Sequence, residues 1–228
     1  MDKRELLDRL VSILLPHTCV FCGGVVAYED LWCGRCHIPW RPEVCQKPPE
    51  REERAYSRLI SPFWYEGGAR DAVVGLKERR DRRAVRYFAG VLASSLEKAQ
   101  LPPSQGCCVL PVPQNEGNLR RRGHNPARLL ADALSAETGL PPAGNLLLRT
   151  EDSLAQHSLD MAQRAENARR SYRRVPCAEL AGERVLLVDD VCTTGSTADA
   201  CAACLRSMGA GEVIALVVCV TKIKVEKR

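Results

Sequence analysis

The sequence predicts an α/β protein in which a mostly parallel sheet is flanked by helices, with a small cysteine-rich module ahead of it. Short apolar runs bounded by glycine and proline alternate with helical patterns from about residue 58 onward, which is typical of a parallel sheet. Two Cys-x-x-Cys pairs lie close together before that region. The 228 residues are 45% hydrophobic and 27% charged, which suits one globular core with a small appendage.

The N-terminal segment, residues 2–15, fits a short amphipathic helix. Its apolar run, Leu10–Leu15, contains Ser12 and ends at Pro16, so it is too short for a membrane span and lacks the cleavage pattern of a signal peptide. The chain has 12 cysteines without these secretory features. We therefore expect a cytoplasmic protein with reduced cysteines and no membrane insertion.

The two cysteine pairs predict a metal site. Each pair offers two thiolates from one tight turn, and two pairs complete the tetrahedral shell of four sulfurs that structural zinc prefers. The segment has too few apolar residues to bury four packed thiols, so we predict one structural zinc ion and a stapling or docking role. The predicted ligands are Cys19, Cys22, Cys33 and Cys36. Three further residues could substitute as ligands: His17, His37 and Cys45.

A polar, proline-containing stretch predicts a linker at residues 46–57. It separates an N-terminal helix and zinc-binding module, residues 1–45, from the main domain, residues 58–228. Strands are expected in the main domain at residues 60–65, 107–110, 184–189 and 212–219. Helical patterns cover residues 67–98, 125–137 and 196–208. The remaining segments are a loop at 111–123, a short apolar run at 146–148, and a polar stretch at 149–170 that predicts a mobile loop followed by a helical turn.

The most informative stretch runs from Val185 to Thr197. An apolar run leads into Asp189 and Asp190, and a loop of hydroxyl residues and one glycine then precedes a helical pattern. Ligands of open α/β sheets bind at the carboxyl ends of strands, and N–H groups at a helix start favour phosphate. The plainer interpretation is one capping and one solvated carboxylate, but the loop favours a sugar-phosphate site. Its residues are Thr193, Thr194, Gly195, Ser196 and Thr197.

A third Cys-x-x-Cys pair, Cys201 and Cys204, lies in the helical pattern after this loop. Its neighbours follow helical apolar spacing, and cysteine is among the most buried residue types. We therefore predict core packing here rather than metal binding or redox chemistry.

The stretch 185–197 resembles the phosphoribosyl pyrophosphate (PRPP) signature of type I phosphoribosyltransferases. The chain as a whole resembles the ComF family, the competence-associated relatives of these enzymes. The resemblance covers the zinc knuckles and nearly all of residues 60–220. It rests on Phe63-Trp-Tyr-Glu-Gly67, Leu76-Lys77, Leu110-Pro-Val-Pro113, Arg122-Gly-His-Asn125 (with His124 in place of an aromatic residue), Ser153-x-x-Gln156-x-x-Leu159, Arg164 and Asn167.

The resemblance implies a type I phosphoribosyltransferase-like fold and roles for single residues. Asp189 and Asp190 would bind the ribose 2′ and 3′ hydroxyls, and residues 193–197 would hold the 5′-phosphate of PRPP or ribose 5-phosphate. Mg²⁺ would accompany PRPP, and a lid at 149–164 would exclude water. Five residues are candidates for the pyrophosphate side: Lys77, Arg121, Arg122, Gln156 and Arg164.

Nothing in the sequence identifies an acceptor, so phosphoribosyltransferase activity stays open. The family's role in DNA uptake during natural transformation implies a partner helicase, for which the zinc module is a candidate docking surface. The alternative function is a non-catalytic adaptor that binds this helicase and single-stranded DNA, with a regulatory or relic PRPP site. Basic patches at 77–86 and 120–122 could contact single-stranded DNA, and the formal charge of +5 suits phosphate ligands generally. Such charge runs are more often solvated helix faces.

Overall fold

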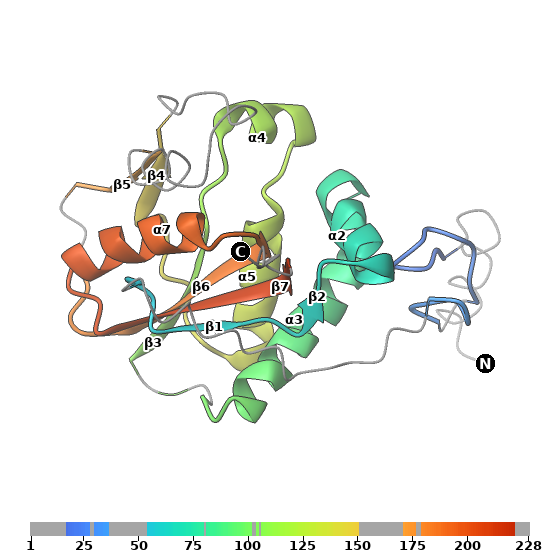
Figure 1. Ribbon diagram of the computed structural model, residues 1–228, viewed down its shortest axis with the longest axis horizontal. Helices are drawn as coiled ribbons and strands as arrows, with labels where there is room; N and C mark the ends of the chain where they lie inside the picture. Colours follow the sequence, from blue (N-terminus) through green and yellow to red (C-terminus); the bar gives the residue numbers. More distant parts are fainter. Residues whose placement is uncertain are drawn as a thin grey trace, which may run out of the picture.

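The computed structural model describes residues 17–27, 30–36, 54–79, 81–101, 104, 106–150, 171–176 and 179–221. Its centre is a five-stranded parallel sheet with the order β1-β7-β6-β3, in which β2 also pairs with β7 (Figure 1). The parallel strands are β1 (Arg58–Ile60), β2 (Phe63–Trp64), β3 (Cys107–Pro111), β6 (Arg184–Cys192) and β7 (Glu212–Val220). A separate antiparallel pair consists of β4 (Leu147–Arg149) and β5 (Tyr172–Arg174).

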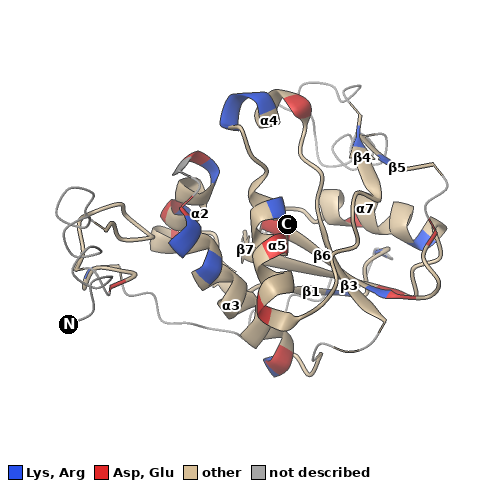
Figure 2. Cartoon of the chain, turned by 180° about the vertical axis from the view of Figure 1, so that it is seen from behind, with Lys and Arg blue, Asp and Glu red and all other residues tan. Residues whose placement is uncertain are grey.

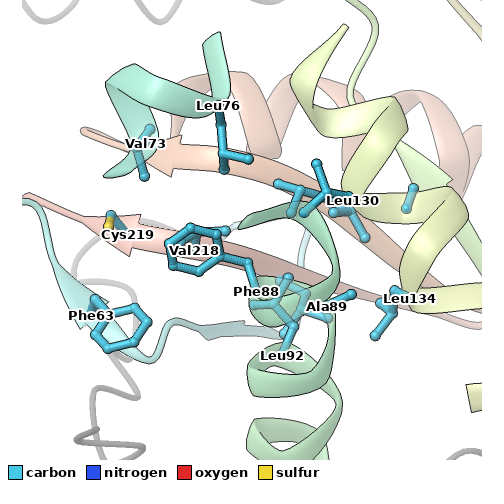
Figure 3. Packing of buried hydrophobic residues seen from close by; sticks show 14 of the residues in the cluster. Phe63, Val73, Leu76, Phe88, Ala89, Leu92, Leu130, Leu134, Val218 and Cys219 are labelled. Carbon is cyan, nitrogen blue, oxygen red and sulfur yellow. The ribbon is translucent and has the colours of Figure 1, made fainter. Parts of the chain in front are cut away.

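Two layers of helices and apolar side chains cover the sheet. Three helices pack on one face: α2 (Gly67–Arg79), α3 (Arg82–Lys98) and α5 (Pro126–Thr138). Helix α7 (Ser196–Ser207) and the β4–β5 pair pack on the other face. Figure 3 shows part of the first layer, to which Phe88 and Leu92 of α3, Leu130 of α5 and Val218 of β7 all belong. The predicted α/β class, with a parallel sheet flanked by helices, is confirmed.

The central strands are apolar on both sides because helices cover both faces of the sheet. Along β6 the side chains alternate between the two layers. Leu186 and Val188 belong to the layer under α3 and α5, whereas Val185 and Leu187 belong to the layer under α7. This alternation sets the direction of every polar side chain at the end of the strand.

Several boundaries differ from the sequence expectation. The expected strand at 60–65 is two short strands, and the helical region at 67–98 is two helices, because Asp81 caps the start of α3 by accepting hydrogen bonds from Arg83 N and Ala84 N. The expected loop at 111–123 contains helix α4 (Glu116–Arg122), which has no buried residue and therefore no apolar periodicity. Strand β6 extends through Cys192, so the two aspartates lie inside it and not after it.

Two expected segments lie outside the described residues: the N-terminal helix at 2–15 and most of the polar segment at 149–170. Of that segment the structure describes Arg149, which ends β4, and Thr150, so the expected mobile loop and helical turn stay predictions. Among the described residues, no helix has the length and apolar character that a membrane crossing needs.

Candidate functional site

The adjacent aspartates at the end of β6 point to opposite faces of the sheet. Asp190 follows the alternation toward α2, where its Oδ1 lies 3.1 Å from Lys77 Nζ. Asp189 points toward α7 and the β4–β5 pair, and its charge influences the pKa of Cys201. A strand with a two-residue period thus presents one carboxylate on each side of the edge at which ligands of parallel sheets bind.

Burial makes both aspartates reluctant to ionise. The pKa of Asp189 is raised to about 7, chiefly by burial and secondly by the charge of the neighbouring Asp190. Asp190 N donates to Asp189 Oδ1 at 2.8 Å, which works in the opposite direction. The pKa of Asp190 is also raised by burial, but the Lys77 ammonium opposes this shift. The edge therefore holds a pair of acidic groups, Asp190 buried and Asp189 half-buried, that a cation or hydroxyl donors would stabilise.

The loop between β6 and α7 forms the next part of the site. Gly195 has a φ of +79°, in the left-handed region, and directly precedes α7. The hydroxyl oxygens of Thr194 and Ser196 are 2.9 Å apart, and Ser196 N donates to Thr194 Oγ1 at 3.4 Å. With Asp189 and apolar side chains of the sheet, the loop lines a small hollow of about 30 Å³. We call residues 193–197 the phosphate loop, because this geometry suits a phosphate group.

A larger cavity of about 300 Å³ adjoins the two aspartates. Three cationic side chains from different elements face it: Lys77 from α2, Arg122 from α4 and Arg149 from β4. Its further lining includes Asn118, Asn125, Tyr172, Asp189, Asp190 and Thr197. The cavity thus combines two carboxylates with three cationic side chains, which suits a ligand carrying both hydroxyl and phosphate groups.

The structure separates the two arginines that the sequence placed on the pyrophosphate side. Arg122 is 17% exposed and lines the cavity, with its Nε 3.9 Å from Glu78 Oε1. Arg121 is 56% exposed, lies 3.7 Å from the same carboxylate, and is absent from the cavity lining among the described residues. The other two candidates on that side, Gln156 and Arg164, lie outside the described residues.

Two cavity residues were missed by the sequence analysis, Arg149 and Tyr172. The Arg149 guanidinium carbon lies 5.4 Å from the centre of the Tyr172 ring, and its charge lowers the pKa of Asp189. Burial raises the pKa of Tyr172. Both residues come from three-residue strands with no detectable periodicity, so their only sequence signal is the position of Arg149 directly after an apolar run.

His124 connects α4 and α2, two of the helices that line this cavity. It is buried, and its ring nitrogens lie 2.9 Å from Arg122 O and 3.0 Å from Leu76 O. Asn125 caps α5 by accepting from Ala127 N, and its Nδ2 donates to Val112 O. The Arg-Gly-His-Asn element therefore holds the end of α4 against the turn of α2 that carries Lys77.

The four N-terminal cysteines form a second site, away from the sheet edge. Their sulfur atoms all lie within 4.8 Å of one another, and Cys22 Sγ is 3.8 Å from Cys33 Sγ. Zinc–sulfur bonds of about 2.3 Å in a tetrahedron place sulfurs about 3.8 Å apart, so the donor set fits this metal. The pKa of Cys33 is lowered to about 6, chiefly by the Arg35 backbone N–H, whereas burial raises that of Cys36 to about 12. The four cysteines are close enough to bind a metal ion.

Aromatic side chains attach this module to α3. The Phe21 ring centre lies 5.9 Å from that of Tyr87 and 6.3 Å from that of Phe88, and Trp32 is 5.4 Å from Tyr87. Phe21 is buried in the same apolar layer as α3. The module is therefore packed against the main domain.

The third cysteine pair behaves as the sequence predicted. Cys201 is fully buried in the layer under α7, and burial raises its pKa well above the ordinary value. Cys204 is half-buried, with its Sγ 3.5 Å from Tyr172 O. Core packing is confirmed for Cys201.

Comparisons with known proteins agree with this architecture. The phosphoribosyl transferase domain family matches residues 121–228. The DNA utilization protein YhgH of Salmonella typhimurium is 30% identical over 210 residues, covering 89% of this chain and 84% of that protein. Competence protein F of Haemophilus influenzae is 27% identical, covering 86% and 81%. Competence protein ComFC of Bacillus subtilis is 25% identical, covering 85% and 73%. The signature residues, the parallel sheet and these relatives together show that the chain belongs to the ComF family.

Proposed function

We propose that this protein binds PRPP at the carboxyl edge of β3 and β6 and serves DNA uptake, as the names of its competence and DNA utilization relatives suggest. The observation that carries the proposal is the continuous series formed by Asp189, Asp190 and the phosphate loop, which leads directly from the central strand into α7. The match to phosphoribosyl transferase domains supports the same ligand class.

Each group of the ligand has matching protein groups nearby. The phosphate loop offers backbone N–H groups at a helix start for the 5′-phosphate. The two carboxylates suit the ribose hydroxyls, which are hydrogen-bond donors. Lys77, Arg122 and Arg149 face the cavity beside them and suit the pyrophosphate. Mg²⁺ bound with PRPP would supply further positive charge for the departing pyrophosphate.

Phosphoribosyl transfer asks little covalent chemistry of the protein. Charge grows on the pyrophosphate as its bond to the anomeric carbon breaks, so prearranged cations are the main contribution that side chains can make. The cavity supplies three of them.

We also propose that the four N-terminal cysteines hold one structural zinc ion. The 3.8 Å separation between Cys22 and Cys33 sulfurs supports a tetrahedral four-sulfur site. Such a closed shell leaves no position for substrate, so the metal would stabilise the module and its packing on α3.

The alternative is a non-catalytic adaptor that binds a helicase and single-stranded DNA. Figure 2 shows basic residues on the outer end of α4. Arg120 and Arg121 are 78% and 56% exposed, but each lies within 4 Å of a glutamate, Glu116 and Glu78 respectively. These pairs reduce the local positive charge, so the surface favours the adaptor function less than the cavity favours PRPP.

Calorimetric titration of the full zinc-loaded chain with PRPP and Mg²⁺ tests the proposal. We expect saturable binding that weakens by about 100-fold or more in an Asp189→Asn/Asp190→Asn variant, because each carboxylate becomes a neutral amide that keeps one acceptor oxygen and replaces the other with a donor NH2 group. Asp132→Asn is the matched control, since Asp132 is 55% exposed on α5. No binding at millimolar PRPP would contradict the proposal, and unchanged affinity in the double variant would show that the site lies elsewhere. Pyrophosphate release with candidate acceptors then separates turnover from binding.

A further inference from the structure

Residues 54–56 lie directly against the phosphate loop, although they precede the first strand of the sheet. Arg54 Nη2 donates to Thr194 O at 3.3 Å across a separation of 140 residues. Ala55 N donates to Asp199 Oδ1 at 2.7 Å. Tyr56 is buried in the layer under α7. These three residues, which the sequence analysis assigned to the end of the linker, form a strap along the outside of the loop.

The strap compensates a charge that would otherwise oppose phosphate binding. Asp199 lies in the first turn of α7, and its carboxylate would repel an anion at that helix start. Arg54 Nη1 lies 3.6 Å from Asp199 Oδ2, and the side chains are only 10% and 13% exposed. Water and salt screen a pair this buried only weakly. The Arg54 charge therefore offsets the repulsion that Asp199 would exert on an anion in the neighbouring phosphate loop.

The strap also fixes the orientation of one loop peptide. Because the carbonyl and N–H groups of a trans peptide point in opposite directions, a bond from Arg54 to Thr194 O turns Gly195 N–H away from Arg54. Tyr56 restricts the same residue from outside, since its hydroxyl oxygen lies 2.7 Å from the position that a Gly195 Cβ would occupy. The strap thus contacts the loop at Thr194 O and limits the space beside Gly195.

We propose that Arg54 and Tyr56 are positioning residues for the phosphate monoester of a ribose phosphate, with Arg54 neutralising Asp199 and attaching the strap to the loop at Thr194 O. The inference rests on the proposed function, because it requires the 5′-phosphate to occupy the phosphate loop. Pyrophosphate, which would occupy the cavity near Lys77 and Arg122, does not depend on the strap.

Substitution of Arg54 separates these ligands. In calorimetric titrations of the full chain with Mg²⁺, Arg54→Met should weaken ribose 5-phosphate and PRPP by about 10-fold or more, while pyrophosphate changes by less than about twofold. Arg54→Lys, which keeps the charge, should recover most of the loss. Arg58→Met is the matched control, because Arg58 also donates to a backbone carbonyl, that of Ala99, but on β1. Its affinities should match those of the unmodified protein.

A double variant distinguishes neutralisation from a general loss of structure. If Arg54 acts by compensating Asp199, adding Asp199→Asn to Arg54→Met should restore affinity for ribose 5-phosphate to within about threefold. Equal losses for all three ligands, or no recovery in the double variant, would overturn the inference about Arg54. The proposed function would still stand if the unmodified chain bound PRPP. Unmodified protein that binds neither ribose 5-phosphate nor PRPP would overturn both.

Discussion

The cysteine module and the carboxyl-edge cavity are assembled in opposite ways. The four sulfurs come from residues 19–36 and meet through two local turns, in which Gly23 N donates to Cys19 O and Cys36 N to Cys33 O. The cavity and its phosphate loop collect residues from positions 54 to 199, on strands, helices and a strap. A local site can be recognised from spacing alone, whereas a dispersed site needs the fold.

The two regions also differ in how charge is balanced. The thiols lie close together, and no cationic side chain is among the causes that shift the pKa values of Cys33 and Cys36. The cavity contains its own cations, and the Lys77 ammonium forms an ion pair with the Asp190 carboxylate. The module is therefore expected to depend on a metal for its structure, and the cavity to exist without its ligand. Four predictions test this contrast.

The largest effect is expected from Cys22→Ser combined with Cys33→Ser. Removing two of four thiolates should reduce bound zinc from about one ion per chain to near zero, since the tetrahedral shell cannot close. PRPP affinity should change by less than about twofold, because no cysteine of the module lines the cavity. Elemental analysis and calorimetry measure the two quantities. Retention of zinc would show that these cysteines are not required ligands. A large loss of PRPP affinity would show that the cavity depends on the cysteine module.

A smaller effect is expected from pH acting on the cavity. The pKa of Asp189 is about 7 in the folded state and about 3.9 in an unfolded chain. The carboxyl group therefore stays protonated to a higher pH in the folded protein. The free energy of unfolding should therefore fall by a few kcal/mol as pH rises from about 4 to 7. Glu212 acts in the opposite direction, but its lowered pKa confines that effect to pH below about 4.5.

Denaturant unfolding between pH 5 and 8 measures this slope. Asp189→Asn should reduce the slope to the part that Asp190 contributes through its own raised pKa. The variant should also be more stable at pH 8, because an uncharged amide replaces a desolvated carboxylate. Asp132→Asn should keep the slope of the unmodified protein. An unchanged slope in Asp189→Asn would contradict the assignment of the buried acid to this residue.

Gly195→Ala should lower the free energy of unfolding by about 1 to 3 kcal/mol. The new Cβ would lie at a φ of +79° and 2.7 Å from the Tyr56 hydroxyl oxygen. Adding Tyr56→Phe should recover part of the loss, since the next ring atom is 3.6 Å away. Gly139→Ala is the matched control, because Gly139 has a φ of +72° and nothing within 4 Å. Equal losses for both glycines would mean that the strap does not constrain the loop.

The smallest effect is expected from Cys204→Ser on α7. Its sulfur is half-buried and makes a weak contact of 3.5 Å with Tyr172 O, which a hydroxyl can replace. Stability should change by less than about 1 kcal/mol, and zinc should stay at about one ion per chain. Loss of zinc in this variant would show that Cys204 is a zinc ligand, which contradicts the predicted core packing of this cysteine pair.

Much of the fold could be predicted because its signals are local. The buried central strand β7 is a continuous apolar run after Glu212, and β6 contains the apolar run Val185–Val188. Helix α5 is marked by Asn125 and Pro126 at its start and Gly139 at its end. Helix α4 and strands β4 and β5 were missed because they are short and lack apolar periodicity. Arg149 and Tyr172 were consequently missed with them.

The sequence by itself identified the four cysteines that lie together and predicted the loop at 193–197 as a sugar-phosphate site, because each signal depends on residue types at fixed spacing along one segment. Only the tertiary structure decided that Asp189 and Asp190 face opposite sides, that Lys77 lies on Asp190, and that Arg122, but not Arg121, lines the cavity. It alone brought Arg54 to the phosphate loop. These contacts join residues far apart in the chain, and their geometry follows from how the helices and strands pack rather than from any local pattern.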